Sequence, residues 1–215
     1  MSATRSAAPI RPRSRRLVLA AGVLGGLAIT VLSAASAQAA LISTSACDSS
    51  TLTQPFLPWG DSNEYKLIPG GDFEGSLAGW TLSGGARKVA GSEPYGATKS
   101  VGSSSLSLPA GASAQAPFTC VNAAYPTFRF FARNDGPVSS VLVSVVYSAP
   151  LLGTVSVPVG TVTLGNGWQP TLPMLTASAV EGAVSGGTAQ VALRFTAIGG
   201  SSQIDDIFVD PRMKW

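Results

Sequence analysis

The 215-residue chain contains no histidine. This absence excludes Ser-His-Asp and Cys-His hydrolases and the imidazole-ligated zinc and copper sites, because each of them needs an imidazole ring. No glycine-rich loop stands between a strand pattern and a helix pattern, so the sequence gives no support to a nucleotide site. The glycines lie between short apolar runs, where they indicate turns.

Charged residues are also scarce, at 12% of the chain, and the formal net charge is +3. Five of the fourteen Lys and Arg residues lie in the first 39 residues, which contain no acid; the remainder has nine bases and eleven acids, a net charge of −2. No cluster of bases with interleaved aromatics remains there. The sequence therefore gives no indication of a nucleic-acid partner.

The first 39 residues have the three parts of a secretory signal peptide. A lead with five arginines precedes an apolar run from Leu17 to Leu32, and small residues follow it. The run is shorter than the roughly 20 residues of a membrane-spanning helix, and Ala37 and Ala39 suit the −3 and −1 positions of a signal peptidase site. We therefore predict that residues 1–39 are cleaved and that the product is secreted or associated with the cell wall, without a membrane segment. An uncleaved N-terminal anchor is the alternative.

The only two cysteines, Cys47 and Cys120, both follow the predicted signal peptide. Exported proteins meet an oxidising environment, so a disulfide bond between the two is predicted. Closing a loop of about 73 residues would stabilise the fold by about 4 kcal/mol on the chain-entropy estimate. A lipid-modified Cys47 is the alternative, but this residue lies far beyond the apolar run and lacks the usual Leu-x-x-Cys lead.

Residues 40–69 are predicted to form an extended N-terminal arm, because most of this segment is proline-rich and irregular. Burying each of its large apolar side chains, Phe56, Leu57 and Trp59, is worth about 1.5–3 kcal/mol. We therefore expect them to lie across one sheet. A Trp59 that faces a ligand is the alternative.

From residue 70 onward, short runs of alternating apolar and polar residues are separated by Gly, Pro, Ser or Asn. This period of two predicts β-strands, and only residues 176–184 have the pattern of a short helical turn. The predicted strands are Trp80–Val89, Ser104–Leu108, Ala116–Val121, Thr127–Arg133, Ser139–Tyr147, Gly153–Leu164, Trp168–Leu175, Thr188–Ala197 and Gln203–Asp210. Their number and spacing predict an all-β fold over residues 70–215, a two-sheet antiparallel β-sandwich of jelly-roll type.

Alternation also assigns the two faces of the predicted strand 127–133. Its two faces carry Phe128, Phe130 and Ala132 on one side and Arg129, Phe131 and Arg133 on the other. We expect one face to belong to the core. The second either lines a concave, ligand-binding sheet or is a solvent face with one aromatic under long arginine stems.

Acidic residues stand inside glycine-rich or apolar patterns in two stretches, 70–80 and 203–211, which we expect to meet in space. Glycoside hydrolysis needs two carboxylates, and the available pairs are Asp72 with Glu74 and Glu74 with Asp205. No strand carries the repeated inward acids that would frame a cleft. An enzyme is therefore not expected.

A calcium ion makes better use of these acids, because it binds carboxylate and backbone carbonyl oxygens. We expect Asp72 and Glu74 to lie on one side of an extended chain, with Asp205 or Asp206 reaching them from the closing strand. The alternative is that these acids cap turns or face solvent.

Three motifs together resemble those of a known family. They are Gly-Asp-Phe-Glu-Gly-Ser-Leu-Ala-Gly-Trp at 71–80, Gly-Trp-Gln at 167–169 and Ile-Asp-Asp-Ile-Phe-Val at 204–209. They are similar to the opening, penultimate and closing strand motifs of jelly-roll carbohydrate-binding modules and related galactose-binding-like domains. The resemblance implies a structural calcium ion held by Gly71, Asp72, Glu74, and Asp205 or Asp206. It also implies that Trp80 and Trp168 belong to the core.

The resemblance favours a secreted, non-catalytic binding module for a glycan or a cell-wall polysaccharide. Aromatic rings stack on the C–H faces of sugars, and the candidate ligand-binding residues are Trp59, Tyr95, Tyr147, Phe131 and Arg129. The N-terminal arm, its disulfide and the lack of an attached catalytic domain depart from the family pattern. They leave open the alternative of a structural or protein-interaction domain of the cell envelope, in which these aromatics only pack. The sequence does not indicate an oligomeric state.

Overall fold

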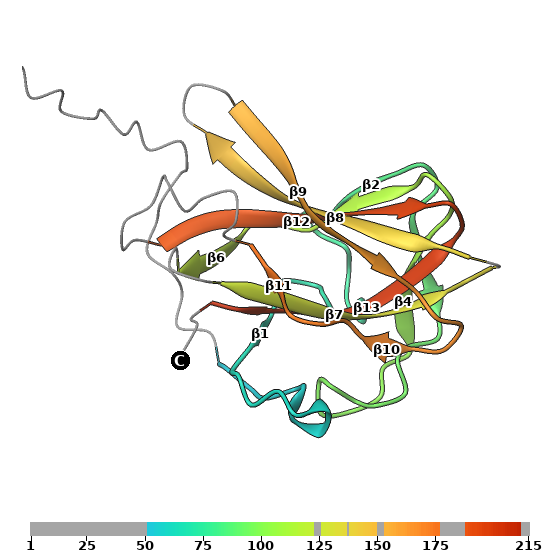
Figure 1. The fold of residues 1–215 in the computed structure, drawn as a ribbon, viewed down its shortest axis with the longest axis horizontal. Coiled ribbons are helices and arrows are strands. Elements are labelled where there is room, and N and C mark those ends of the chain that lie inside the picture. Colours follow the sequence, from blue (N-terminus) through green and yellow to red (C-terminus); the bar gives the residue numbers. More distant parts are fainter. Residues whose placement is uncertain (1–50, 123–125, 137, 150–152, 177–187, 212–215) are drawn as a thin grey trace, which may run out of the picture. The chain divides into compact units, whose positions relative to one another are not determined.

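The alternating segments form two antiparallel sheets (Figure 1). The structure is a computed structural model, which describes residues 51–122, 126–136, 138–149, 153–176 and 188–211. Every strand pair in these residues is antiparallel. The prediction of a two-sheet antiparallel β-sandwich is therefore confirmed.

The first sheet has seven strands in the order β10-β7-β13-β4-β3, with β1 paired to β13 and β11 paired to β7. Its strands are β1 (Lys66–Leu67), β3 (Arg87–Ala90), β4 (Ser104–Leu108), β7 (Thr127–Asn134), β10 (Gln169–Pro170), β11 (Met174–Leu175) and β13 (Ser202–Asp210). The second sheet has six strands in the order β2-β5-β12-β8-β9, with β6 paired to β12. Its strands are β2 (Thr81–Ser83), β5 (Ser113–Gln115), β6 (Thr119–Asn122), β8 (Ser140–Ala149), β9 (Gly153–Thr163) and β12 (Thr188–Ile198).

The main core lies between the two sheets, because alternation turns every second side chain toward the facing sheet. On β7 the core residues are Phe128 and Phe130, and on β8 they are Val141, Val143 and Val145. All five are fully buried, and each contributes about 1.5–3 kcal/mol by leaving water. The predicted core face of β7 is therefore confirmed.

The segment predicted as one strand, Trp80–Val89, is two strands that belong to different sheets. Gly84 and Gly85 stand between β2 and β3 with φ angles of 64° and 86°, a left-handed conformation that costs glycine little. A Cβ on Gly84 would also lie 2.8 Å from the Cα of Ala112. The prediction was wrong here because the turn glycines were placed inside a strand.

Other boundaries differ in smaller ways. The predicted strand Trp168–Leu175 is divided into β10 and β11, with the ring of Pro173 between them and no N–H there to continue a ladder. The predicted strand Ala116–Val121 begins at Thr119 instead, after the separate strand β5. Most of the predicted helical turn at residues 176–184 lies outside the described residues.

The opening and closing stretches meet, as expected. The Ile207 amide donates a hydrogen bond to the Gly71 carbonyl over 3.1 Å, and the Ile68 amide donates to the Ile207 carbonyl over 3.0 Å. A Cβ on Gly71 would lie 2.9 Å from the Ile207 oxygen, so the close approach requires glycine. This contact lies at the irregularity of β13 between Asp205 and Phe208.

The opening stretch is not extended, so Asp72 and Glu74 do not share one side of a strand. Residues 69–75 form turns and bends, and Phe73 has a φ angle of 53°. That left-handed conformation is unfavourable for a bulky residue, but the Phe73 ring is fully buried and packs 5.1 Å from the Trp80 ring. Core packing therefore overrides the expected local conformation.

A second apolar cluster lies on the outer face of the seven-stranded sheet. Phe131 and Phe208 of the sheet pack there against Phe56 and Tyr65 of the N-terminal arm. Figure 1 shows the short helix η1 (Leu57–Trp59) and β1 on the side of this sheet that faces away from the second sheet. Phe56 thus lies across the sheet as predicted, whereas Leu57 and Trp59 remain 53% and 37% exposed.

Cys120 lies in β6, is buried and is not a free thiol. Its predicted partner, Cys47, lies outside the described residues, as does the predicted signal peptide, so both assignments stay predictions. Within the residues that the structure describes, no helix is both long and apolar enough to cross a membrane.

Candidate functional site

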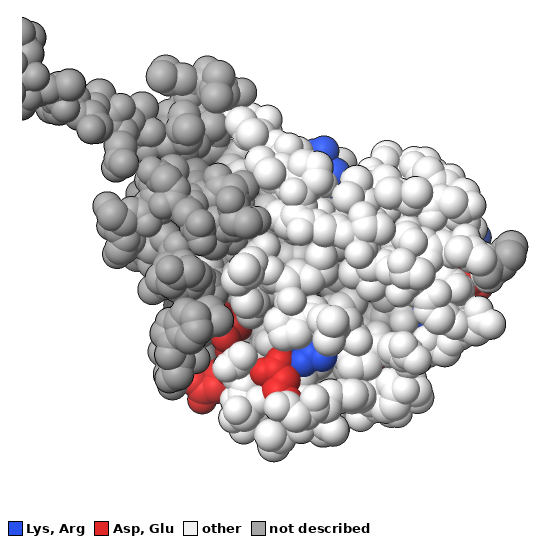
Figure 2. Space-filling view, in the orientation of Figure 1, with Lys and Arg blue, Asp and Glu red and all other residues white. Residues whose placement is uncertain are grey.

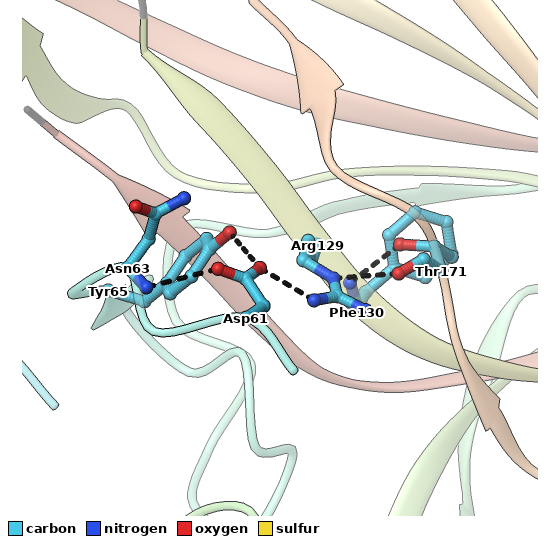
Figure 3. A network of polar contacts seen from close by, with 6 residues as sticks. All are labelled: Asp61, Asn63, Tyr65, Arg129, Phe130 and Thr171. Carbon is cyan, nitrogen blue, oxygen red and sulfur yellow. Dashed lines mark hydrogen bonds and ion pairs between the residues drawn. The ribbon is translucent and has the colours of Figure 1, made fainter. Parts of the chain in front are cut away.

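An ion pair joins the N-terminal arm to the outer face of the first sheet (Figure 3). Asp61 follows η1, and Arg129 projects from β7; Oδ2 of Asp61 lies 2.6 Å from Nη1 of Arg129. The two side chains are only 12% and 5% exposed. Replacing one partner of an ion pair that is this shielded from solvent is strongly destabilising, because the remaining charge stays buried without a partner.

Neutral groups complete this network. The Tyr65 hydroxyl donates to the Asp61 carboxylate over 2.7 Å, and the Asn63 amide donates to it over 3.0 Å. Burial by itself raises the pKa of Asp61, but the hydrogen bonds from Tyr65 and Arg129 outweigh it and lower the pKa below its ordinary value. Arg129 also donates through Nε to the Thr171 carbonyl over 2.7 Å. The arm is thus tied to β7 and, through β7, to the segment between β10 and β11.

Arg129 and Phe131 face neither a ligand nor solvent. Both alternatives predicted for this face of the strand are therefore wrong for these two residues. They are 4% and 0% exposed, because the arm covers them. The Arg129 guanidinium lies over the Phe56 ring at 4.1 Å, a cation–π contact, and the Phe56 and Phe131 rings stack at 5.6 Å. Both residues therefore hold the arm and present no surface to a ligand.

The arm in turn positions Trp59 at the surface. Its ring meets the Tyr95 ring edge to face, with 5.1 Å between centroids and an interplanar angle of 87°. The Phe131 ring supports Trp59 from below at 5.5 Å. Trp59 and Tyr95 are 37% and 50% exposed, so the structure brings together two of the five predicted ligand-binding residues and leaves both accessible.

Tyr95 lies in the loop between β3 and β4, residues 91–103. Hydrogen bonds to a buried carboxylate hold this loop in place. The buried Glu93 carboxylate accepts hydrogen bonds from the Tyr95 amide and, over 2.9 Å, from the Ala97 amide. The Tyr95 hydroxyl donates to the Trp168 carbonyl over 2.9 Å. The tyrosine is therefore held at both its backbone and its hydroxyl.

A groove of about 230 Å³ opens beside these rings, between the arm and the β3–β4 loop. We call it the arm groove. It is lined by Thr53, Gln54, Pro55, Pro58, Trp59, Tyr95, Gly96, Ala97 and Lys99. Its lining combines two flat rings with a few polar groups, the composition expected of a small-molecule or glycan site.

A larger groove of about 360 Å³ lies between the end of β9 and residues 169–174. Its lining contains neither an aromatic ring nor an ionisable side chain. It therefore offers no stacking surface and no charged group to orient a ligand, and the arm groove is the stronger candidate despite its smaller volume.

The fifth predicted ligand residue, Tyr147, is buried in the main core, and its hydroxyl donates to the Thr176 carbonyl over 2.8 Å. Trp80 packs against the main core, as the resemblance implied, but Trp168 packs against the second cluster on the outer face. The sequence did not single out Gln54 and Lys99. Nothing in the pattern around these two residues indicates a groove, which exists only because the arm folds back.

Among the predicted calcium ligands, Glu74 accepts hydrogen bonds from the end of the β3–β4 loop and the first residue of β4. Its Oε1 accepts from the amides of Ser103 and Ser104 over 2.7 and 2.8 Å, and its Oε2 accepts from the Ser103 hydroxyl over 2.6 Å. The hydrogen bond from the Ser103 side chain is the main reason that the pKa of Glu74 lies below its ordinary value. Asp72 accepts from the Glu74 amide over 3.3 Å, as a turn cap does.

The other predicted ligands, Asp205 and Asp206, belong to a buried group of acids with Glu93. Asp205 accepts from the Ser92 hydroxyl over 2.6 Å and from the Glu93 amide over 2.9 Å. Burial raises the pKa of Asp205 to about 7 against these hydrogen bonds. Burial, and then the charges of Asp205 and Glu93, raise the pKa of Asp206 well above its ordinary value.

In the described part of the chain, no three His, Cys, Asp or Glu residues form a group that could hold a metal ion. Gly71 contributes a carbonyl to the Ile207 amide instead. Binding of calcium stays a prediction.

No protein-family model matches the sequence, and no curated protein sequence is significantly similar to it. Among solved structures, the chain is similar to the CBM22-1–GH10 modules of xylanase 10B from Clostridium thermocellum, with a TM-score of 0.47, 13% identity and coverage of 70% of this chain and 29% of that chain. It is also similar to the family 11 carbohydrate-binding module from Clostridium thermocellum, with a TM-score of 0.46, 12% identity and coverage of 70% and 98%. For the CBM22-1 xylan-binding domain of Paenibacillus barcinonensis Xyn10C, the TM-score is 0.44, the identity 14% and the coverage 66% and 93%.

These structures are modules of the kind that the three sequence motifs resemble. The chain spans less than a third of the length of the xylanase chain, and the identities and TM-scores are low throughout. The similarity therefore carries no information on a ligand.

The contacts of Glu74 predict how it stabilises the fold. Glu74→Ala removes three hydrogen bonds to Ser103 and Ser104 at a solvent-exposed position, which should lower the free energy of unfolding by about 1 kcal/mol. We expect this loss in chelator, measured by urea unfolding of metal-free protein. Equal stability of the variant and the wild type in chelator, with a difference only in calcium, would assign Glu74 to an ion instead of these donors.

The buried acids predict a pH dependence. The folded pKa values of Asp205 and Asp206 are raised above the unfolded value of about 3.9, so the folded protein retains protons that the unfolded chain releases as the pH rises. Their contribution to stability is therefore complete below about pH 4 and is lost as the pH rises, through about 7 for Asp205 and at higher pH for Asp206. The melting temperature should be lower at about pH 8 than at about pH 5.

Asp206→Asn keeps this buried position uncharged and should flatten the pH dependence, whereas Asp135→Asn, at an exposed acid, should not. Thermal melts monitored by circular dichroism across the pH range measure this. A wild-type melting temperature that rises over the range, or an Asp206→Asn variant with the wild-type slope, contradicts the assignment.

Proposed function

We propose that the protein is a secreted, non-catalytic module that binds a polysaccharide in the arm groove. The observation that carries the proposal is the pair of exposed, mutually supported rings of Trp59 and Tyr95 at a groove with polar groups. Flat rings bury the C–H faces of a sugar while side chains such as Gln54 and Thr53 can hydrogen-bond its hydroxyls. Secretion rests on the pattern of residues 1–39.

The chemistry of the groove supports binding without catalysis. Hydrolysis of a glycosidic bond needs two carboxylates on either side of the scissile bond, and the lining of the arm groove contains none. The Asp61 carboxylate is engaged by Arg129 and Tyr65, and Glu93, a residue of the β3–β4 loop, is fully buried. The lining of the groove therefore supports binding and does not support hydrolysis.

A structural or protein-interaction domain of the cell envelope is the second candidate. The observation in its favour is that Trp59 also contacts the Phe56 and Phe131 rings, at 6.5 and 5.5 Å. Packing alone would therefore account for the position of this tryptophan.

Affinity electrophoresis in gels that contain soluble glycans or wall fractions separates the two candidates. We expect retardation by at least one polysaccharide, and about a tenfold loss of affinity in Trp59→Ala and in Tyr95→Ala, since 1.4 kcal/mol of lost contact is tenfold. Phe118→Ala is the matched control, because Phe118 is an aromatic of similar exposure, 40%, outside the groove.

No retardation across a broad panel would favour the envelope domain. A loss in Phe118→Ala equal to that in Trp59→Ala would show that binding does not depend on the arm groove.

A further inference from the structure

A straight row of polar side chains crosses the outer face of the seven-stranded sheet. Gln203 of β13 pairs with Arg133 of β7 on one side and with Ser107 of β4 on the other, and Ser107 pairs with Arg87 of β3. Trp168 continues the row beyond β7, since the next residue, Gln169, pairs with Ala132. We call these five residues the arginine row.

Alternation shows that the row faces away from the main core. The neighbours of the row along β7, β13 and β4 are Ala132, Ile204 and Leu106, and all three belong to the main core. Residues of a strand that alternate with core residues lie on the opposite face. The row therefore shares the outer face with the arm and the β3–β4 loop.

The two guanidiniums of the row contact neutral acceptors only. Arg133 donates through Nε and Nη2 to the Gln203 amide oxygen over 3.2 and 3.0 Å, and Arg87 donates through Nη1 to the Gly85 carbonyl over 3.3 Å. Among the described residues, neither forms an ion pair with a carboxylate. Each guanidinium has five N–H donors, so donors as well as charge remain for a ligand.

The next carboxylate along β13, that of Asp205, does not contact the arginine row. Asp205 lies two residues beyond Gln203 on β13, but it is fully buried beneath the β3–β4 loop. Its oxygens accept hydrogen bonds from Ser92, Glu93 and the Asp206 amide. On the face drawn in Figure 2, nearly all of the described surface is uncharged. Only 12% of the residues in the chain are charged, so a guanidinium without a carboxylate partner contributes strongly to the local potential.

Trp168 joins the row to the arm groove. The Arg133 guanidinium lies 5.3 Å from the Trp168 ring, and the Trp168 carbonyl accepts from the Tyr95 hydroxyl. A polymer that stacks on Tyr95 can therefore continue over Trp168 onto the row.

We propose that the arginine row binds the acidic groups of an anionic polysaccharide whose chain also occupies the arm groove. The inference rests on the proposed function and deepens it. Guanidinium groups bind carboxylates and phosphates through two parallel hydrogen bonds. Arg133 and Arg87 stand on strands separated by three interstrand spacings, about 14 Å, which suits acidic groups repeated along an extended chain.

The test measures the affinity of the mature protein for polygalacturonate, for its carboxyl-reduced neutral counterpart and for poly(glycerol phosphate). We expect the wild type to bind at least one of the two anionic polymers about tenfold more tightly than the neutral polymer, and binding that weakens as salt increases. Arg133→Gln combined with Arg87→Gln should remove this preference and its salt dependence, and leave affinity for the neutral polymer unchanged. Preference for polygalacturonate or for poly(glycerol phosphate) identifies the anion as carboxylate or phosphate.

Arg194→Gln is the matched control. Arg194 donates through Nε and Nη2 to the Gln115 amide oxygen over 3.2 and 2.7 Å, which reproduces the Arg133–Gln203 geometry on the other sheet. The control should keep the wild-type preference, and melting curves should show that all variants are folded.

Two results overturn the proposal without touching the proposed function: equal wild-type affinity for charged and neutral polymers, or an equal loss of preference in Arg194→Gln. In both cases Trp59→Ala would still bind about tenfold more weakly than the wild type. If none of the three polymers binds, the arginine-row proposal fails, and the broad glycan panel described above decides the proposed function separately.

Discussion

The ion pair between Asp61 and Arg129 is the interaction on which the outer face of the protein depends. The outer face of the first sheet carries Phe131 and Phe208, which would meet water if the arm did not cover them. The arm covers both rings with Phe56 and Tyr65, and the buried ion pair fixes its position. A hydrophobic contact alone is not directional, whereas a hydrogen-bonded ion pair selects one arrangement. The arm groove and its Trp59 are consequences of that arrangement.

The opposite wall of the groove depends on a second buried polar group. Asp205 and Glu93 bind the backbone and side chains of residues 92, 93, 95 and 97, so the loop that bears Tyr95 is fastened to β13. Three buried acids would repel one another if all were ionised, and burial raises the pKa values of two of them, Asp205 and Asp206. The surface of this face thus depends on buried ionisable groups, the acids beneath the loop and the Asp61–Arg129 ion pair.

Most of the sandwich could be predicted from sequence, because alternation and turn residues act locally: β4 and β9 were located almost to the residue. The division of residues 80–89 between two sheets was missed, since it depends on a close approach of Gly84 to Ala112. The site was harder. Trp59 and Tyr95 were among five candidates, and nothing local distinguishes them from the buried Phe131 and Tyr147. Exposure there is decided by an arm that folds back over a strand about 70 residues away, and no local pattern records such a contact.

Hydrogen exchange of the arm, followed by NMR, tests the central claim most directly. The amides of Thr53 and Tyr65 are bonded to each other's carbonyls, over 2.8 and 2.7 Å, and so report on the arm alone. In Asp61→Asn, which leaves Arg129 buried without a carboxylate at a cost of about 3 kcal/mol, these amides should exchange about a hundredfold faster. Amides of β12 in the other sheet should keep their wild-type rates. If the Thr53 and Tyr65 amides of the variant remain as protected as in the wild type, the ion pair does not hold the arm, and the account of the groove is wrong.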